Sequence, residues 1–163
     1  PPGSEGEIVA RGPAMMIGYA DPAQTAEAID AQGYFRTGDL GVVSADGAIT
    51  VTGRKKDLII RGGENISAGE IEAVLLTHPL VADCAVVAMP HPRLGEGVCA
   101  YVVLRDAVDP AALGAHVAAA GLAKQKIPER FVTAETLPRT PSGKIRKDVL
   151  RSEIAERIRR EAA

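Results

Sequence analysis

Two nearly continuous runs of apolar residues, 81–89 and 98–104, constrain the fold of this chain more than any other feature. Short apolar runs bounded by polar and turn-forming residues are typical of strands that lie in a core. Aromatic residues make up only 3% of the chain and Trp is absent, so the core must consist of Val, Ile, Leu and Ala. We therefore predict a sheet with core strands at both runs.

The first third of the chain has a different pattern, which predicts mainly β-structure. A strand is expected at 7–10, and Asp21 followed by Pro22 is typical of a helix start. The dipeptide at 46–47, Asp-Gly, separates two β-branched runs and predicts a hairpin.

From residue 57 onward the pattern alternates between strands and helices. Ser67 and Glu70 form a capping-box pattern that opens a helix ending before His78. The remaining elements expected in this part are a strand at 57–61, a helix at 110–120, a third core strand at 131–133, a loop at 137–143 and a terminal helix. The predicted fold class is α+β: a three-stranded sheet flanked by helices, residues 56–163, preceded by a β-rich segment, residues 1–55.

Composition argues against several classes of protein. A net charge of −2 gives no basic field for nucleic acid or an anionic membrane, and the scarcity of aromatic residues argues against stacking on single strands. No stretch reaches the ~20 apolar residues of a membrane span. Cys84 and Cys99 lie in apolar runs without metal-site spacing, which predicts core thiols and favours a reducing, cytoplasmic location. The chain starts at Pro1 without Met, and we expect it to be part of a longer protein.

The first of three motifs with chemical potential surrounds Asp39, in the segment 34–40. A carboxylate beside a glycine at a strand end can accept hydrogen bonds from two vicinal hydroxyls, such as those of a ribose. The alternative is a turn carboxylate that caps nearby amides.

The second motif, 53–65, combines a cluster of charges with a short strand and the paired glycines Gly62 and Gly63. Such glycines permit a positive φ and let a ligand approach the backbone. The alternative is a solvated linker with a tight turn.

The third motif, 137–147, holds Lys144 in a Pro- and Gly-containing loop just before the terminal helix. A compact ammonium group there suits a phosphoryl transition state, whose negative charge must be balanced. The spacing differs from that of a P-loop, and the alternative is a solvated loop lysine.

In this order and spacing, the three motifs resemble the late signature motifs of the adenylate-forming enzymes, which include acyl- and aryl-CoA synthetases. Gly6-Glu7-Ile8 with Gly12 and Gly18 resembles the motif that precedes them in that family. The resemblance extends over essentially the whole chain. It implies that residues 1–55 end a large N-terminal domain and that 56–163 form the mobile C-terminal domain.

The resemblance also implies roles for individual residues. These are ribose binding by Asp39 with help from Arg54, a hinge at Lys56, a loop lining the pantetheine tunnel at Gly62, Gly63 and Glu64, and catalysis of adenylation by Lys144; no metal ligand is implied.

The implied reaction has two halves and makes an acyl-CoA thioester. A carboxylate attacks the α-phosphate of Mg²⁺-bound ATP, giving acyl-AMP and pyrophosphate, and the CoA thiol then displaces AMP. ATP, Mg²⁺ and CoA are expected for the complete enzyme, with none bound to this chain alone, which should be inactive.

The residues of the motifs at 61–67 and 140–147 resemble those of CoA ligases and favour that branch of the family. They leave the acyl substrate open. The alternatives are an aryl-AMP ligase that loads a carrier protein and a freestanding non-catalytic module that acts with a partner. The expected partners are a carboxylic acid, CoA and the missing N-terminal domain, with neither nucleic acid nor a membrane span. A homodimer through residues 1–55 is a further possibility.

Overall fold

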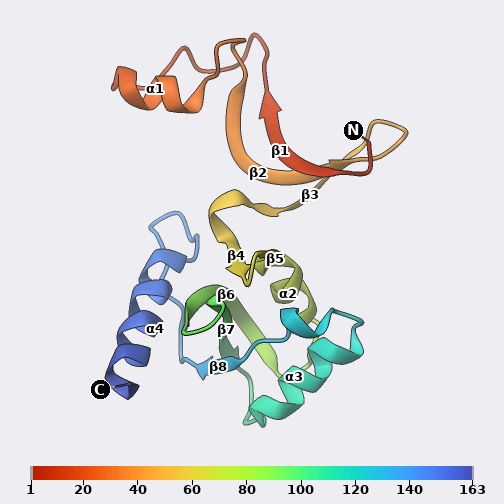
Figure 1. Ribbon diagram of the computed structural model, residues 1–163, viewed down its shortest axis with the longest axis vertical. Coiled ribbons are helices and arrows are strands. Elements are labelled where there is room, and N and C mark those ends of the chain that lie inside the picture. Colours follow the sequence, from red (N-terminus) through yellow and green to blue (C-terminus); the bar gives the residue numbers. More distant parts are fainter. Residues whose placement is uncertain (1, 163) are drawn as a thin grey trace. The chain divides into compact units, whose positions relative to one another are not determined.

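Figure 1 shows a computed structural model of the protein, which describes residues 2–162. The chain divides into two compact units between Lys56 and Asp57, whereas the sequence prediction placed the division after residue 55. The elements of the first unit are β1 (Glu5–Ala10), α1 (Pro22–Ala28), β2 (Phe35–Val43) and β3 (Ile49–Arg54). The three strands form one antiparallel sheet in the order β1-β2-β3.

Local signals fix two features of the first unit. The Asp21 side chain accepts a hydrogen bond of 2.8 Å from the Ala23 amide and caps α1, with Pro22 in the first turn, as predicted. The turn at 44–48 joins β2 to β3, and Gly47 adopts a φ of +85° there. The predicted Asp-Gly hairpin is therefore confirmed, and it brings the end of β3 back beside β2.

The short 3-10 helix η1 (Lys55–Asp57) spans the division, and the second unit contains the remaining elements. They are β4 (Leu58–Arg61), β5 (Glu64–Ser67), α2 (Ala68–Leu75), β6 (Val81–His91), β7 (Gly95–Leu104), α3 (Pro110–Ala119), η2 (Lys124–Lys126), β8 (Arg130–Thr133) and α4 (Lys147–Glu161).

The second unit has the predicted mixture of strands and helices, but its sheet has five strands rather than three. The order is β5-β4-β7-β6, and β8 pairs in parallel with β7. The prediction missed β5 and left β4 out of the sheet. Both strands are four residues long, and β5 reads Glu-Asn-Ile-Ser, so neither length nor apolar content marked them.

Strands β6 and β7 are apolar over most of their length because both faces of the sheet are covered. Alternate residues point to opposite faces, so Cys84 joins a core with α2 and α3 while the adjacent Ala85 joins a core with α4. On β7, Cys99 and Tyr101 face the α4 side, whereas Val98 faces the other core. Figure 1 shows α4 on one side of these strands and α2 and α3 on the other.

Both cysteines are buried free thiols, as predicted. Burial raises the pKa of Cys84 and the pKa of Cys99 to about 12 in each case. Both side chains therefore stay protonated at neutral pH and act as small apolar residues.

The capping-box prediction was wrong in its bonding. Helix α2 begins after Ser67 as expected, but the Ser67 side chain makes no capping hydrogen bond. Glu70 instead forms an ion pair of 2.6 Å with Lys126 of η2. A tertiary partner that the local pattern does not contain therefore took the place of the local contact.

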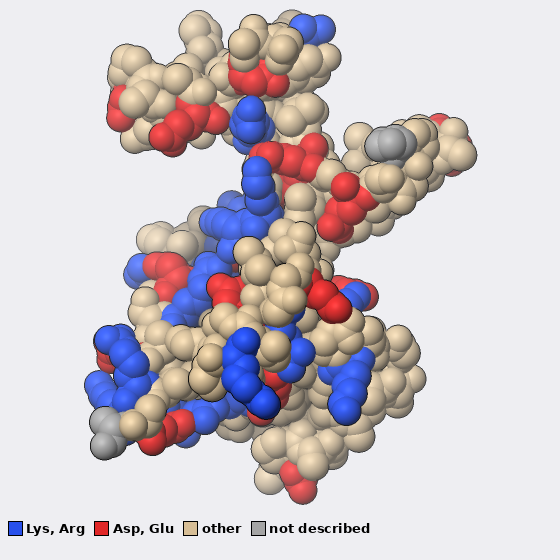
Figure 2. Space-filling model, in the orientation of Figure 1, with Lys and Arg blue, Asp and Glu red and all other residues tan. Residues whose placement is uncertain are grey.

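Acidic and basic side chains alternate along α4 and form the predicted solvated face. Two pairs at i,i+4 spacing, Arg157–Glu161 at 3.2 Å and Arg160–Glu156 at 3.3 Å, lie on its outer surface. Figure 2 shows blue and red side chains interspersed there. Within residues 2–162, no helix is long and apolar enough to cross a membrane.

Candidate functional site

The residues singled out from the sequence fall into three groups, each built by a different local structure. The first group is Asp39 on β2 and Arg54 on β3, which are direct cross-strand partners. Arg54 Nε donates to Asp39 Oδ1 at 2.8 Å, and the two side chains are 48% and 30% exposed. The hairpin at 44–48 brings the two strands together, and a register shift between Leu40 and Gly41 places Arg54 opposite Asp39.

The backbone around Asp39 is held by a side chain two residues earlier. The Asp39 amide donates to Thr37 Oγ1 at 3.0 Å, and the Thr37 hydroxyl donates to the Ile8 carbonyl at 2.7 Å. Gly38, between them, has a φ of +72°. A carboxylate can accept up to about four hydrogen bonds, so the Arg54 contact leaves Asp39 able to accept from hydroxyl groups of a ligand.

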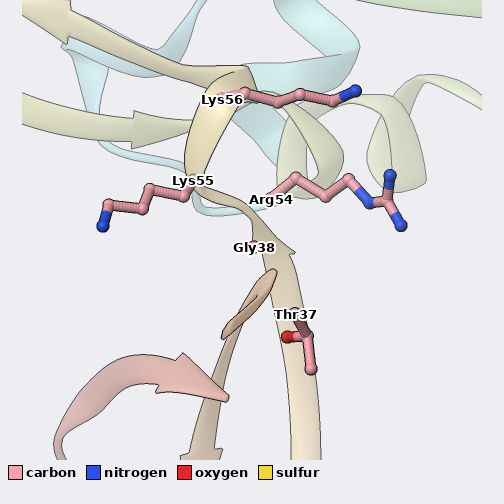
Figure 3. A pocket seen from close by; sticks show the side chains of 5 residues that line it. All are labelled: Thr37, Gly38, Arg54, Lys55 and Lys56. Carbon is pink, nitrogen blue, oxygen red and sulfur yellow. The ribbon is translucent and has the colours of Figure 1, made fainter. Parts of the chain in front are cut away.

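A pocket of the first unit lies beside this pair and is lined by Thr37, Gly38, Arg54, Lys55 and Lys56. Figure 3 shows Arg54 and Lys56 extending to one side of the chain and Lys55 to the other. Lys55 Nζ contacts Glu7 Oε2 at 3.1 Å. The lining thus carries guanidinium and ammonium groups beside a hydroxyl, and Arg54 and Lys55 each pair with a carboxylate of the same unit. Lys56, the predicted hinge residue, is exposed in η1.

The second group is the two-residue turn between β4 and β5. Gly62 and Gly63 have φ values of +59° and +89°, and Arg61 pairs directly with Glu64 across the turn. Positive φ at both central residues is the requirement of a type I′ hairpin, which glycine meets without strain. The sequence located the turn but did not show that it closes a hairpin.

Contacts with distant segments hold this turn in place. The Gly62 amide donates to the Leu94 carbonyl at 2.9 Å, and Glu64 Oε2 accepts from Gln125 Nε2 at 2.8 Å. A Cβ added at Gly63 would meet nothing within 4 Å. The space beside the Gly63 α-carbon is therefore open.

The third group is the hairpin that carries Lys144, residues 139–145, here called the lysine hairpin. The Thr140 amide donates to the Lys144 carbonyl at 2.8 Å, and the Lys144 amide donates to Thr140 Oγ1 at 3.1 Å. Gly143 donates to the Thr140 carbonyl at 2.9 Å and has a φ of +84°. A three-residue loop of this kind, with its last residue in the left-handed region, is a common hairpin connection.

Arg139 fixes the tip of the lysine hairpin. Its Nη1 donates to the Gly143 carbonyl at 2.6 Å, and its Nη2 forms an ion pair with Asp83 on β6. The Lys144 side chain is exposed, and within residues 2–162 its ammonium forms no ion pair. An unneutralised cation on a fixed turn is suited to an anionic reaction centre. Sequence reasoning did not assign Arg139 this role, since its partner lies 56 positions away.

The structure thus pairs Asp39 with Arg54 in the first unit, where Arg54 and Lys56 line one pocket, and places the glycine turn and the lysine hairpin in the second. Among the described residues, no group of three or more His, Cys, Asp or Glu side chains is placed to hold a metal ion. His78 and His116 lie edge to face with ring centroids 5.0 Å apart, remote in sequence from all three groups.

Comparison with known proteins shows which proteins the chain is similar to. Residues 70–144 match the family described as AMP-binding enzyme C-terminal domain. The chain is 50% identical over 162 residues to medium-chain fatty-acid–CoA ligase of Escherichia coli K12. This match covers 97% of the chain and 29% of that relative. It is 42% identical over 159 residues to 2,3-dihydroxybenzoate-AMP ligase of Bacillus subtilis, covering 96% of the chain and 30% of the relative.

Among solved structures, o-succinylbenzoate CoA synthetase from Bacillus subtilis, in complex with its acyl-adenylate intermediate, aligns with a TM-score of 0.87 at 37% identity. The alignment covers 92% of this chain and 31% of that one. The chain therefore belongs to the adenylate-forming enzymes, as the motifs predicted. It contains an AMP-binding enzyme C-terminal domain and spans about 29% of the length of the fatty-acid–CoA ligase that it matches.

Proposed function

We propose that the chain is the C-terminal part of an ATP-dependent acid–thiol ligase that makes acyl-CoA by way of acyl-AMP. In this proposal, residues 1–55 complete a large N-terminal domain and residues 56–163 are its mobile C-terminal domain. The observation that carries the proposal is the exposed ammonium of Lys144, which a hydrogen-bonded hairpin holds without an ion pair within residues 2–162.

In the first half-reaction, a carboxylate oxygen attacks the α-phosphorus of ATP, and pyrophosphate leaves with the electrons of the broken P–O bond. ATP enters as the Mg²⁺ complex, and Asp39 with Arg54 bind the ribose hydroxyls. Lys144 contacts the carboxylate and the α-phosphate, where its charge balances the pentacoordinate phosphorus. The Asp39–Arg54 pair is partly exposed and the Lys144 side chain is exposed, which fits contact with a substrate.

In the second half-reaction, the CoA sulfur attacks the acyl carbonyl, AMP leaves, and the thiol proton passes to solvent. Gly62, Gly63 and Glu64 line the path of the pantetheine arm. Lys56 is the hinge about which the C-terminal domain turns, so that each half-reaction uses a different loop of that domain. The open backbone at Gly63 supports this assignment.

The acceptor defines a second candidate function, loading of an aryl acid onto a carrier protein. The similarity to 2,3-dihydroxybenzoate-AMP ligase favours considering it, although the identity of 42% is lower than the 50% to the fatty-acid–CoA ligase. Both candidates share the adenylation step. They differ in whether free CoA or the pantetheine of a carrier protein accepts the acyl group.

The proposal predicts that Lys144→Ala in the complete ligase abolishes acyl-AMP formation but spares thioester formation from supplied acyl-AMP. Pyrophosphate release with a panel of carboxylic acids measures the first step, and acyl-CoA formation measures the second. Equal loss of both steps would contradict the role of Lys144. The chain alone should release no pyrophosphate with any acid, because it spans only about 29% of the matched ligase.

A further inference from the structure

Four charged side chains from three distant segments of the second unit meet at the start of α4. Lys147 Nζ lies 2.7 Å from Glu72 Oε1 of α2 and 3.9 Å from Asp57 Oδ2, and Arg151 Nη2 lies 3.4 Å from Asp57 Oδ1. The side chains of Lys147, Asp57 and Glu72 are only 15%, 16% and 20% exposed. An ion pair so shielded from water is screened less than one on the surface.

The position of Lys147 in its helix is electrostatically unfavourable. Lys147 is the first residue of α4, where the helix dipole favours negative charge and disfavours a cation. Ordering a lysine side chain also costs conformational entropy. The ion pair with Glu72 offsets both costs, so the helix start depends on that contact.

Glu72 is itself fixed to the sheet. Its Oε1, the atom that contacts Lys147, also accepts a hydrogen bond of 2.6 Å from the Val86 amide of β6. Because Val86 lies in the middle of a core strand, Glu72 ties the ammonium of Lys147 to the buried sheet.

Only two residues separate Lys147 from Lys144. The two residues between them are held in place, because Ile145 packs against the α4-side core and the Arg146 amide donates to the Pro138 carbonyl at 2.8 Å. A shift at Lys147 is therefore transmitted to the lysine hairpin. Asp57, which directly follows the proposed hinge residue, shares the same cluster.

We propose that Lys147 is a positioning residue, whose ion pair with Glu72 fixes the end of the lysine hairpin and so holds the Lys144 ammonium for adenylation. This inference rests on the proposed function of Lys144. A misplacement of about 1 Å at a reacting centre can cost on the order of 100-fold in rate. The effect of losing Lys147 should therefore fall on the half-reaction that uses Lys144.

The test is Lys147→Met in the complete ligase, which keeps the aliphatic stem and removes the charge. We expect kcat for acyl-AMP formation to fall between about tenfold and 100-fold, with thioester formation from supplied acyl-AMP near the wild-type rate. Lys147→Arg should restore most of the lost rate because it keeps the charge opposite Glu72. Glu72→Gln, whose amide oxygen can still accept from Val86, should reproduce the Lys147→Met effect.

The matched control is Arg130→Gln. Arg130 binds Glu161 at the other end of α4, at 2.8 and 2.6 Å, so this variant removes an anchor of the same helix without touching the lysine hairpin. Adenylation should stay near wild type. Hydrogen exchange gives a readout independent of activity: amides at 139–145 should exchange faster in Lys147→Met than in Arg130→Gln.

Each remaining outcome decides between the two proposals. Full adenylation by Lys144→Ala would overturn the proposed function. If Lys144→Ala is inactive but Lys147→Met adenylates at the wild-type rate, the positioning role alone is wrong. An equal fall of both half-reactions in Lys147→Met would indicate a merely structural role and overturn the inference. If Lys147→Met fails to fold, as judged by its thermal transition, the rates of the two half-reactions in Glu72→Gln decide in the same way.

Discussion

The lysine hairpin requires a left-handed backbone conformation at a single residue, Gly143. Its φ of +84° lies in the left-handed region, and a Cβ there would meet nothing within 4 Å, so the requirement concerns the backbone alone. The strain of an L-residue in this region is roughly 1–2 kcal/mol.

We predict that Gly143→Ala lowers the unfolding free energy of the second unit by about 1–2 kcal/mol, as measured by urea denaturation. The matched control is Gly114→Ala in the middle of α3, where the new Cβ would lie 3.7 Å from Ile127 Cγ2, an ordinary contact. Alanine in a helix interior is favoured over glycine by roughly 0.5–1 kcal/mol, so this control should raise stability. Shifts of the same sign in both variants would show that left-handed backbone is not the cause.

Several residue roles could be predicted from the sequence because they depend on neighbours along the chain. Asp21 caps α1, and Gly62 and Gly63 make a turn, because each acts within a few residues. The contacts of Glu70 and Lys147 could not be predicted. Their partners, Lys126 and Glu72, lie 56 and 75 positions away along the chain, and no local pattern encodes such a distance.

Among the secondary-structure elements, strands β6 and β7 each contain one buried thiol. Cys84 on β6 and Cys99 on β7 face opposite cores. Burial raises the pKa of each thiol from its ordinary value of 9.0 to about 12. The folded unit therefore binds these protons more tightly than the unfolded chain. The stability that this contributes is complete below about pH 9 and is lost as the pH rises toward 12.

We predict that neither thiol reacts with iodoacetamide at about pH 8 in the folded protein, and that both react in urea, since the thiolate is the nucleophile. The urea midpoint of the second unit should fall as the pH rises above about 9, the value for the unfolded thiol. The double variant with Cys84→Ala and Cys99→Ala should lose part of this pH dependence. Alkylation of the native protein, seen by intact mass, would show that the strands open locally.

Element type followed from sequence wherever an apolar run was long. The runs at 81–89 and 98–104 became the greater part of β6 and β7, because long strands buried on two faces are apolar over most of their length. Strand β5 escaped prediction because it contributes one buried side chain, Ile66, and its pairing with β4 is what makes it a strand.

For the molecule as a whole, the main contrast is that the two units bury very different numbers of hydrophobic side chains. Within residues 2–56, Leu40 is the one hydrophobic side chain that is buried. Large hydrophobic residues are exposed in the same unit, namely Val9, Ile17, Tyr19, Val43, Ile49 and Val51. The second unit, in contrast, builds two cores on the faces of one sheet.

We predict that the two units of the isolated chain have very different stabilities, because apolar burial is the main force that opposes chain entropy. Hydrogen exchange followed by mass spectrometry should show slow exchange at β6, β7 and α4 and fast exchange throughout residues 2–56. Sedimentation at several concentrations is the control, since a dimer through the first unit would protect it. Equal protection of both units in a monomer would contradict the prediction.

The sequence by itself determined the family, the α+β class, the long core strands and the positions of Asp39, Gly62, Gly63 and Lys144 along the chain. These depend on residue type and short spacing, and on a turn chemistry that acts over a few residues. Only the tertiary structure decided which side chains support them. The pairing of Asp39 with Arg54, of Arg139 with Asp83 and of Lys147 with Glu72 requires strands and helices to pack first. Packing brings these groups within bonding distance, and local sequence does not specify it.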